Sequence, residues 1–338
     1  MQRGLKFVAG FLAGCALALT AHAQAPAQPK PLQPLNVITF DGGWNLPVWA
    51  AQRQGFFADN GIALNLSYTP NSVVLMTGLM EGKYQIALAG VDNFVAYQEG
   101  QGEAKIPDNP DLFVFMGGDG GYLTVWGGQN IRSFADLKGK TLSVDAMTTG
   151  FAFVLRELVS RAGLTEKDVT YVRAGATGNR YRELVAGKHD ATLLRTPFEL
   201  QAKARGANLL GSGETLGPYL GTSGGARRSW AAANEQTLIG FLRAYKAGVD
   251  FVADKSNREI AEALLVANSR DMTPALAKQA YDLLLAEKGG IVRDLSVDLA
   301  GLSTVLALRS KYGTPQKSLT DPAKYVDTSY LKKALPSK

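Results

Sequence analysis

The chain has 338 residues, of which 46% are hydrophobic and 20% charged, and this is enough chain for two globular domains. Its 36 lysines and arginines exceed its 30 aspartates and glutamates only slightly, which excludes the strongly basic surface of a nucleic-acid-binding protein, so we expect no nucleic-acid partner. One cysteine and two histidines exclude a Cys/His zinc site, a CxxC redox pair and a Cys–His nucleophile. We therefore expect no metal and no cofactor.

The first residues have the three parts of an export signal. Two positive charges lie within the first six residues, an apolar run covers 7–19, and a small-x-small site ends at Ala23. The apolar run is about 13 residues long, whereas a membrane-spanning helix needs about 20. We predict a signal peptide over residues 1–23, cleaved before Gln24, and hence a periplasmic protein.

Lipoprotein processing is the alternative, because residues 12–15 match a lipoprotein box in which Cys15 would be acylated. Against it, the apolar run continues past this cysteine. Residues 24–34 contain four prolines and three glutamines and offer little apolar surface to bury. They are predicted to form a flexible leader.

Two segments that lie 105 residues apart share one pattern. Leu79–Leu88 and Leu184–Leu193 each contain the end of an amphipathic helix, a Gly-Lys stop and a short apolar strand. The same offset places the strand-like run Leu35–Phe40 over Lys140–Asp145. These matches predict an internal duplication in which each copy reads strand, helix, strand, helix, strand. Such a copy forms a parallel sheet flanked by helices.

Glycine-rich segments follow each copy, around Gly117–Gly121 and from Gly211 to Gly225. They are candidate crossovers between two lobes, and the helical remainder is predicted to pack back on the first lobe. This gives an α/β fold of two parallel-sheet lobes joined by glycine-rich crossover segments. The predicted domains are lobe 1, from 35–120 plus 219–338, and lobe 2, from 121–218.

Short motifs spread from about residue 35 to about residue 335 carry a family resemblance. They are Gly55-Phe56-Phe57 with Gly61-Ile62, the run Asp136–Val144, Leu184–Gly187 with Asp190-Ala191, and Tyr325–Leu331. Together they resemble the periplasmic solute-binding proteins of ABC importers, in the nitrate/sulfonate/taurine and thiamine-precursor-binding branch. The resemblance implies a monomer with the type II binding-protein fold. It also implies a small-molecule ligand in the cleft between the lobes and an inner-membrane ABC permease as partner.

Ligands of parallel α/β sheets bind beyond the carboxyl ends of the strands, where loops and helix N-termini present backbone N–H groups. The offset of 105 residues pairs three such loops, which are 42–45 with 147–150, 91–93 with 196–198, and 71–72 with 176–177. Ordinary helix capping is the alternative role of each loop. The candidate ligand-binding residues are Gly43, Trp44, Asn45, Asn71, Ser72, Asp92, Asn93, Thr148, Thr149, Gly150, Thr177, Arg195 and Thr196.

Two of these side chains have open alternatives. Trp44 could stack on a ligand or cover the core. Arg195 stands at the end of its strand, so it could face the cleft or pair with Glu199 at i,i+4. The segment Arg195–Glu199 also departs from the aromatic-acidic-Pro run that is usual in the family, so no relative's ligand can be transferred.

A small organic anion suits the predicted cleft, for example a sulfonate, a carboxylate or a related aromatic compound. Helices that begin after Asn45 and Thr149 offer partial positive charge, and Arg195 offers a bidentate donor. Asp41 and Asp92 argue the other way, because a carboxylate in the pocket repels an anion. Alternatives within the fold are a pyrimidine-precursor binder and a periplasmic ligand sensor.

An enzyme is the rival class. The segment Gly221–Gly225 matches G-x-S-x-G, but a nucleophile elbow requires a later histidine and the last one in the chain is His189. Fold-related pyrimidine synthases use a cysteine-rich run, which this chain lacks. We therefore expect no enzyme.

The processing prediction can be checked by the intact mass of the exported protein. We expect a mature chain that starts at Gln24, because Ala21 and Ala23 satisfy the small-residue rule. A diacyl mass increment that disappears in a Cys15→Ala variant would instead establish lipoprotein processing.

Overall fold

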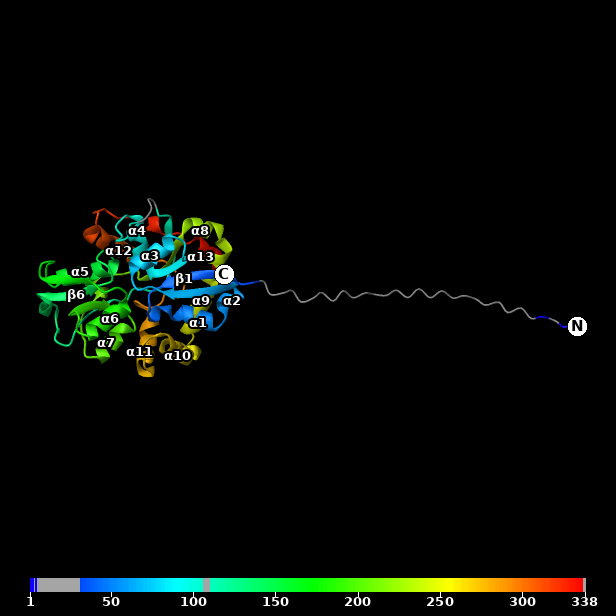
Figure 1. Cartoon of the computed structure of the whole chain (residues 1–338), viewed down its shortest axis with the longest axis horizontal. Coiled ribbons are helices and arrows are strands. Elements are labelled where there is room, and N and C mark those ends of the chain that lie inside the picture. The colour runs from blue at the N-terminus through cyan, green and yellow to red at the C-terminus, as the bar shows by residue number, and fades with distance from the viewer. Residues whose placement is uncertain (3, 5–30, 106–109, 337–338) are drawn as a thin grey trace. The chain divides into compact units, whose positions relative to one another are not determined.

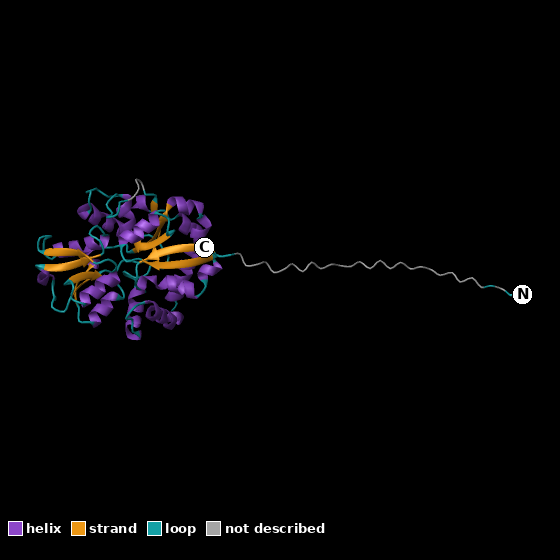
Figure 2. Ribbon diagram, in the orientation of Figure 1, coloured by secondary structure: helices purple, strands orange, loops and turns teal. Residues whose placement is uncertain are grey.

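The computed structural model describes residues 1–2, 4, 31–105 and 110–336. The predicted signal peptide, with its cleavage site and Cys15, and most of the leader lie outside these residues. From Leu32 onward the chain forms one compact unit, in which two groups of strands are flanked by helices (Figure 2). Within the described ranges, no helix is both long and apolar enough to cross a membrane.

The first sheet has five strands in the order β2-β1-β3-β10-β4. β1 runs parallel to β2 and β3, whereas β10 runs antiparallel to β3 and β4. Alternate or continuous burial of Val, Ile, Leu and Phe on these strands places the core on both faces of the sheet. The strands are β1 (Gln33–Thr39), β2 (Ile62–Tyr68), β3 (Ile86–Gly90), β4 (Leu112–Gly117) and β10 (Thr222–Arg227).

The second sheet also has five strands, in the order β7-β6-β8-β5-β9. β6 runs parallel to β7 and β8, and β5 runs antiparallel to β8 and β9. The strands are β5 (Thr124–Gly127), β6 (Lys140–Val144), β7 (Val169–Arg173), β8 (Ala191–Leu194) and β9 (Asn208–Ser212). The first lobe and the second lobe below are the parts of the chain built around these two sheets.

Helices follow the strands in both lobes, and Figure 1 labels α5, α6 and α7 beside β6 and α1, α2 and α9 at the opposite end of the compact unit. The helices of the second lobe are α5 (Gly150–Arg161), α6 (Thr177–Val185) and α7 (Phe198–Ala204). The other helices are α1 (Leu46–Arg53), α2 (Phe56–Asp59), α3 (Ser72–Met80), α4 (Val91–Gln98), α8 (Arg228–Ala233), α9 (Glu235–Ala253), α10 (Arg258–Asn268), α11 (Pro274–Leu284), α12 (Leu299–Tyr312) and α13 (Ser329–Ala334). Short 3-10 helices are η1 (Gly43–Asn45), η2 (Phe134–Leu137), η3 (Gly213–Leu216), η4 (Lys255–Asn257) and η5 (Pro322–Tyr325).

The predicted duplication is confirmed by the sheet orders. β1, β2 and β3 of the first sheet occupy the places of β6, β7 and β8 in the second. Helices α3 and α6 begin at Ser72 and Thr177 and end at Met80 and Val185, so both bounds are 105 residues apart. The sequence alone predicts this repeat because both copies have glycines at the same helix ends and apolar residues at the same spacing.

The expectation of purely parallel sheets is wrong for the crossover strands. β5, which follows the first crossover, enters the second sheet antiparallel, and β10, which follows the second crossover, returns antiparallel into the first sheet. Each crossover therefore leads into a strand of the lobe that the chain enters, and this strand runs against its neighbours. Both sheets are mixed, because four strands of each run in one direction and the strand that follows a crossover runs against them.

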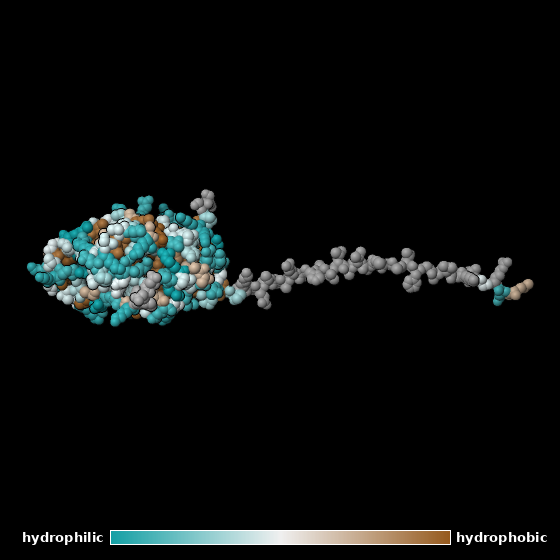
Figure 3. All heavy atoms as spheres, turned by 90° about the horizontal axis from the view of Figure 1, so that it is seen from above, coloured by the Kyte–Doolittle hydropathy of each residue, from teal (hydrophilic) through white to brown (hydrophobic). Residues whose placement is uncertain are grey.

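Among the C-terminal helices, α9 packs on the first lobe, whereas α12 and α11 also contact α5 and α7 of the second lobe. α9 lies against α1, and at Gly248 the helices approach so closely that a Cβ would collide with the carbonyl of Pro47. The helix that begins after Asn45 ends at Arg53, and Gly55, which has a φ of 81°, separates it from α2. On the face shown in Figure 3, hydrophobic residues are scattered among hydrophilic ones.

The two crossovers lie side by side. Gly118 N–H donates to the carbonyl of Thr222 at 2.8 Å, and Gly221 N–H donates to the carbonyl of Asp119 at 3.0 Å. A Cβ on Gly118 would lie 2.8 Å from the Thr222 carbonyl oxygen, so this glycine is needed for close approach of two backbones. Among Gly117–Gly121, only Gly121 has a positive φ, 65°.

Substitution of Gly118 tests this close approach. We expect Gly118→Ala to lower the free energy of unfolding by about 1–3 kcal/mol, because one crossover must move away from the other. A matched Gly128→Ala variant, whose Cβ would lie 3.6 Å from the nearest atom, should change it by less than about 0.5 kcal/mol. Urea denaturation of both variants measures the difference, and equal effects would contradict the assignment.

Candidate functional site

A cavity of about 30 Å³ lies between the lobes, where the carboxyl ends of β3, β6 and β8 meet. One water molecule needs about 10–15 Å³ of such volume, so the cavity has room for about two. Aromatic rings form part of its wall and two arginines supply its positive charge. The lining residues are Phe40, Trp44, Leu88, Ala89, Gly90, Asp92, Asn93, Asp145, Thr149, Gly150, Phe151, Thr177, Arg180, Arg195 and Thr222.

The structure brings about half of the predicted residues to this cavity. Those that line it are Trp44, Asp92, Asn93, Thr149, Gly150, Thr177 and Arg195. Those that do not line it are Gly43, Asn45, Asn71, Ser72, Thr148 and Thr196. Each of the second group has a role in ordering a loop or in joining the lobes.

Asn71 and Asn45 order loops of the first lobe. Asn71 accepts a hydrogen bond from the Val74 N–H at 2.9 Å and is therefore the N-cap of α3. Helix capping was the alternative to a ligand-binding role for this residue. Asn45 does not cap α1. Its side-chain amide donates to the carbonyls of Phe40 and Gly42 at 2.7 and 3.1 Å.

Backbone groups of the remaining predicted residues join the lobes. Gly43 N–H donates to the carbonyl of Thr196 at 3.1 Å, and Ser72 N–H donates to the Asp145 carboxylate at 3.2 Å. The carbonyl of Thr148 accepts from Arg309. These contacts bring the loops together without exposing the side chains to the cavity.

Arg195 lines the cavity and does not bond to Glu199, so the i,i+4 alternative is wrong. Its Nη2 donates to Asp119 Oδ1 at 2.6 Å and its Nη1 donates to Thr222 Oγ1 at 3.0 Å. The guanidinium carbon lies 4.2 Å from the centre of the Trp44 ring, a cation–π contact. Its Nε is buried and has no hydrogen-bond partner.

Arg180 on α6 is a cavity residue that the sequence analysis missed. It is 2% exposed, its Nη1 donates to the Gly175 carbonyl at 2.6 Å, and its Nη2 donates to the Leu193 carbonyl at 3.1 Å. Its Nε is also buried without a partner. Desolvation lowers the pKa of Arg180 to about 10, so it stays protonated at neutral pH. The sequence held one sign of this role. Arg180 lies one helical turn after Thr177 and one before Leu184, and both of these neighbours are buried.

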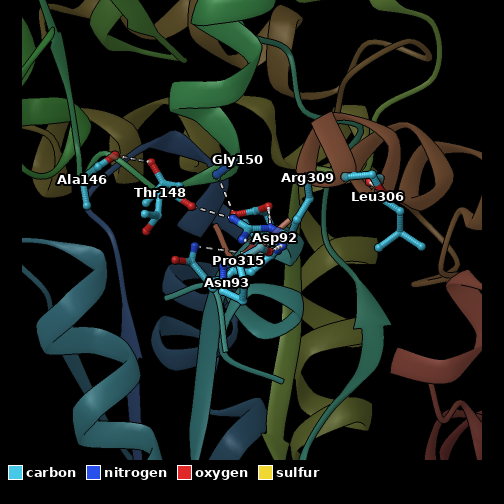
Figure 4. A network of polar contacts seen from close by, with 12 residues as sticks. Asp92, Asn93, Ala146, Thr148, Gly150, Leu306, Arg309 and Pro315 are labelled. Carbon is cyan, nitrogen blue, oxygen red and sulfur yellow. Dashed lines mark hydrogen bonds and ion pairs between the residues drawn. The ribbon is translucent and has the colours of Figure 1, made fainter. Parts of the chain in front are cut away.

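Asp92 is neutralised by a residue 217 positions later in the chain. Arg309 of α12 donates its Nε to Asp92 Oδ1 at 2.6 Å and its Nη2 to Oδ2 at 2.8 Å (Figure 4). The Gly150 N–H, at the start of α5, donates to the same carboxylate at 2.5 Å. Arg309 is fully buried. The objection that Asp92 would repel an anion is therefore removed by its partner.

Asp145 and Asp41 are the remaining carboxylates at the cleft. Asp145 lines the cavity, and Asp41 lines an adjacent pocket of about 400 Å³ together with Tyr68 and Tyr181. Burial raises the pKa of both carboxyls, although hydrogen bonds from Ser72 to Asp145 and from Gly178 to Asp41 oppose this.

The charges around the cavity balance in number. The guanidiniums of Arg180, Arg195 and Arg309 are matched by the carboxylates of Asp92, Asp119 and Asp145. Two of the arginines form ion pairs, whereas Arg180 is held by a hydroxyl and backbone carbonyls alone. Two guanidinium Nε–H groups thus remain for an acceptor brought by a ligand.

Comparisons with known proteins agree with this architecture. Residues 120–258 match the family model described as NMT1/THI5 like, and no curated protein matches the chain. The alkanesulfonate-binding protein SsuA from Xanthomonas axonopodis pv. citri, bound to MOPS, is similar with a TM-score of 0.69 and 17% identity over 88% of this chain and 99% of that chain. The periplasmic nitrate-binding protein NrtA from Synechocystis PCC 6803 is similar with a TM-score of 0.72 and 13% identity over 90% of this chain and 88% of that chain.

A ligand-binding component of an ABC-type import system from Staphylococcus aureus, with zinc bound, is similar with a TM-score of 0.72 and 12% identity over 90% of this chain and all of that chain, 100%. These structural similarities, which extend over about nine-tenths of the chain, establish the fold. It is the two-lobe α/β fold of type II periplasmic binding proteins. The resemblance that the sequence motifs carry is confirmed for the fold and for the NMT1/THI5-like domain.

The carboxyl of Glu199, which is buried beside Thr196, allows the effect of burial on its pKa to be tested. It is 2% exposed, accepts from the Thr196 hydroxyl at 2.7 Å and has one oxygen without a partner. Desolvation raises the pKa of its carboxyl from 4.5 to about 7. Because this pKa is raised on folding, the stability contribution is complete below about pH 4.5 and is lost as the pH rises through 7.

We therefore expect Glu199→Gln to stabilise the protein at pH 8 by about 2–3 kcal/mol and to have little effect at pH 4.5, since glutamine has the shape of the neutral acid. Thermal unfolding at both pH values measures this. Exposed Glu259 is the control, and Glu259→Gln should show no such pH dependence. A Glu199→Gln effect that is equal at both pH values would contradict the ionisation of Glu199 in the folded protein.

Proposed function

We propose that this protein is an exported, monomeric solute-binding protein that captures a small organic anion between its lobes and delivers it to an ABC importer permease. We take the lobes as residues 35–120 plus 219–338 and residues 121–218. The observation that carries the proposal is the pair of buried, unpartnered Nε–H groups of Arg180 and Arg195, two residues that line the cavity.

A buried donor without an acceptor costs free energy, and an anion recovers it through charge-assisted hydrogen bonds. A carboxylate or sulfonate oxygen could accept from both Nε–H groups. Phe40, Trp44 and Phe151 offer an apolar wall for the organic body of the ligand. The site therefore favours a sulfonate, a carboxylate or a related aromatic compound over an inorganic ion.

Admission of the ligand requires the lobes to separate, because the cavity has room for about two waters only. The paired crossovers are the segments about which such a rotation would occur. Similar proteins support transport as the purpose, because they include an alkanesulfonate-binding protein, a nitrate-binding protein and a ligand-binding component of an ABC-type import system. Binding and release of this kind require no catalytic residue.

The proposal is tested by a thermal-shift screen of sulfonates, carboxylates and pyrimidines, followed by calorimetry of the best compound. We expect Arg180→Gln to raise its Kd about 10- to 150-fold, which corresponds to about 1.5–3 kcal/mol for a charged hydrogen bond. Arg180→Lys should weaken binding less, because it keeps the positive charge although it loses the guanidinium donors.

The matched control is Arg132→Gln, which removes an exposed arginine of the second lobe. Its Kd should equal that of the wild type. Binding that is unchanged in Arg180→Gln, or a tight ligand that is a cation, would overturn the anion assignment.

A further inference from the structure

Asp145 and Asp92 each bond to the first residue of a helix in the opposite lobe. Asp145 follows β6 in the second lobe, and its two oxygens accept from the N–H of Ser72, the first residue of α3, at 3.3 and 3.2 Å. Asp92 of the first lobe accepts from Gly150, the first residue of α5, at 2.5 Å. In both cases a carboxylate crosses the cleft to a backbone donor.

Asp41 makes a contact similar to that of Asp145, but from the first lobe to a helix of the second lobe. It follows β1 in the first lobe, and its carboxylate lies against Gly178, the second residue of α6 in the second lobe. A Cβ on Gly178 would collide with the Asp41 carboxylate. The internal duplication places β1 on β6 and α3 on α6, so the two contacts join equivalent elements of the two copies, although Asp41 and Gly178 each lie one residue beyond the exact equivalents of Asp145 and Ser72.

The occupied groups are the ones that an anion would use. The N-terminus of a helix carries about half a positive charge and unpaired N–H groups, which bind anions. Here α3, α5 and α6 each have an aspartate of the opposite lobe at that position. Among the side-chain donors of the residues that line the cavity, the Nε–H groups of Arg180 and Arg195 are buried and have no partner.

We propose that Asp41 and Asp145 are specificity-determining residues, which take the place of a ligand anion at the N-termini of α6 and α3 and thereby restrict the cleft to solutes with one negative charge. This inference rests on the proposed function. A solute with a second negative charge would place it near Asp145 in a poorly solvated cavity, where like charges repel strongly. Burial lowers the pKa of Arg180, and the charges of Asp145 and Asp41 oppose this lowering, so both aspartates act electrostatically on Arg180.

Sulfate and methanesulfonate are suitable probes, because they share a tetrahedral SO₃ group and differ by one unit of charge. We expect Asp145→Asn to bind sulfate at least about tenfold more tightly than the wild type does in calorimetry at fixed ionic strength. The asparagine oxygen can still accept from Ser72, so the loop contact is kept. Affinity for methanesulfonate should change by less than the affinity for sulfate.

Asp190→Asn is the matched control, because Asp190 also accepts from a backbone N–H, that of Thr141 at 2.9 Å, and does not line the cavity. It should leave sulfate affinity unchanged. If Asp145→Asn fails to fold, Asp41→Asn supplies the same test. The inference is overturned if neither variant binds sulfate more tightly than the wild type, or if the control gains as much.

The arginines separate this inference from the proposed function. In the Asp145→Asn background, Arg180→Gln should abolish the gained sulfate binding. A gain that survives Arg180→Gln would overturn this inference, since the anion would then be bound elsewhere. Absence of any gain, with a screened ligand still dependent on Arg180, would leave the proposed function standing and remove the inference alone.

Discussion

The buried ion pair between Asp92 and Arg309 is the contact on which the arrangement of the lobes depends. Arg309 donates to both oxygens of Asp92 at the start of α4, to the carbonyl of Thr148 beside α5, and to Gln101. A buried guanidinium left without its carboxylate would be strongly destabilising. This single side chain therefore joins α4, α12 and the N-terminus of α5, and so both lobes, in one network.

The same requirement for charge pairing shapes the rest of the cleft. Arg195 is satisfied by Asp119 and Thr222 at the crossovers, so a residue at the end of a second-lobe strand is tied to the segments that link the lobes. Asp145 is satisfied by the backbone of α3. Together these contacts form a charge-balanced and nearly filled cleft, in which the Nε–H groups of Arg180 and Arg195 are buried side-chain donors without a partner.

Internal duplication explains why the cleft has this form. Two copies of one strand-helix unit place the carboxyl ends of β1 and β3 opposite those of β6 and β8, and the crossover strands complete each sheet from the other side. Acidic residues that follow β1 and β6 then meet the helices of the opposite copy.

The sequence by itself determined the order of elements, the offset of the duplication and the loops that reach the cleft, because glycine stops, caps and apolar periodicity act over a few residues. Trp44, Gly150 and Arg195 were found in this way. Partners of charged side chains were decided by tertiary structure alone. Asp92 and Arg309 are 217 residues apart, and Arg195 forms its ion pair with Asp119 and not with its near neighbour Glu199. No local pattern encodes such choices, since they depend on which buried charges the packed lobes leave within hydrogen-bond distance.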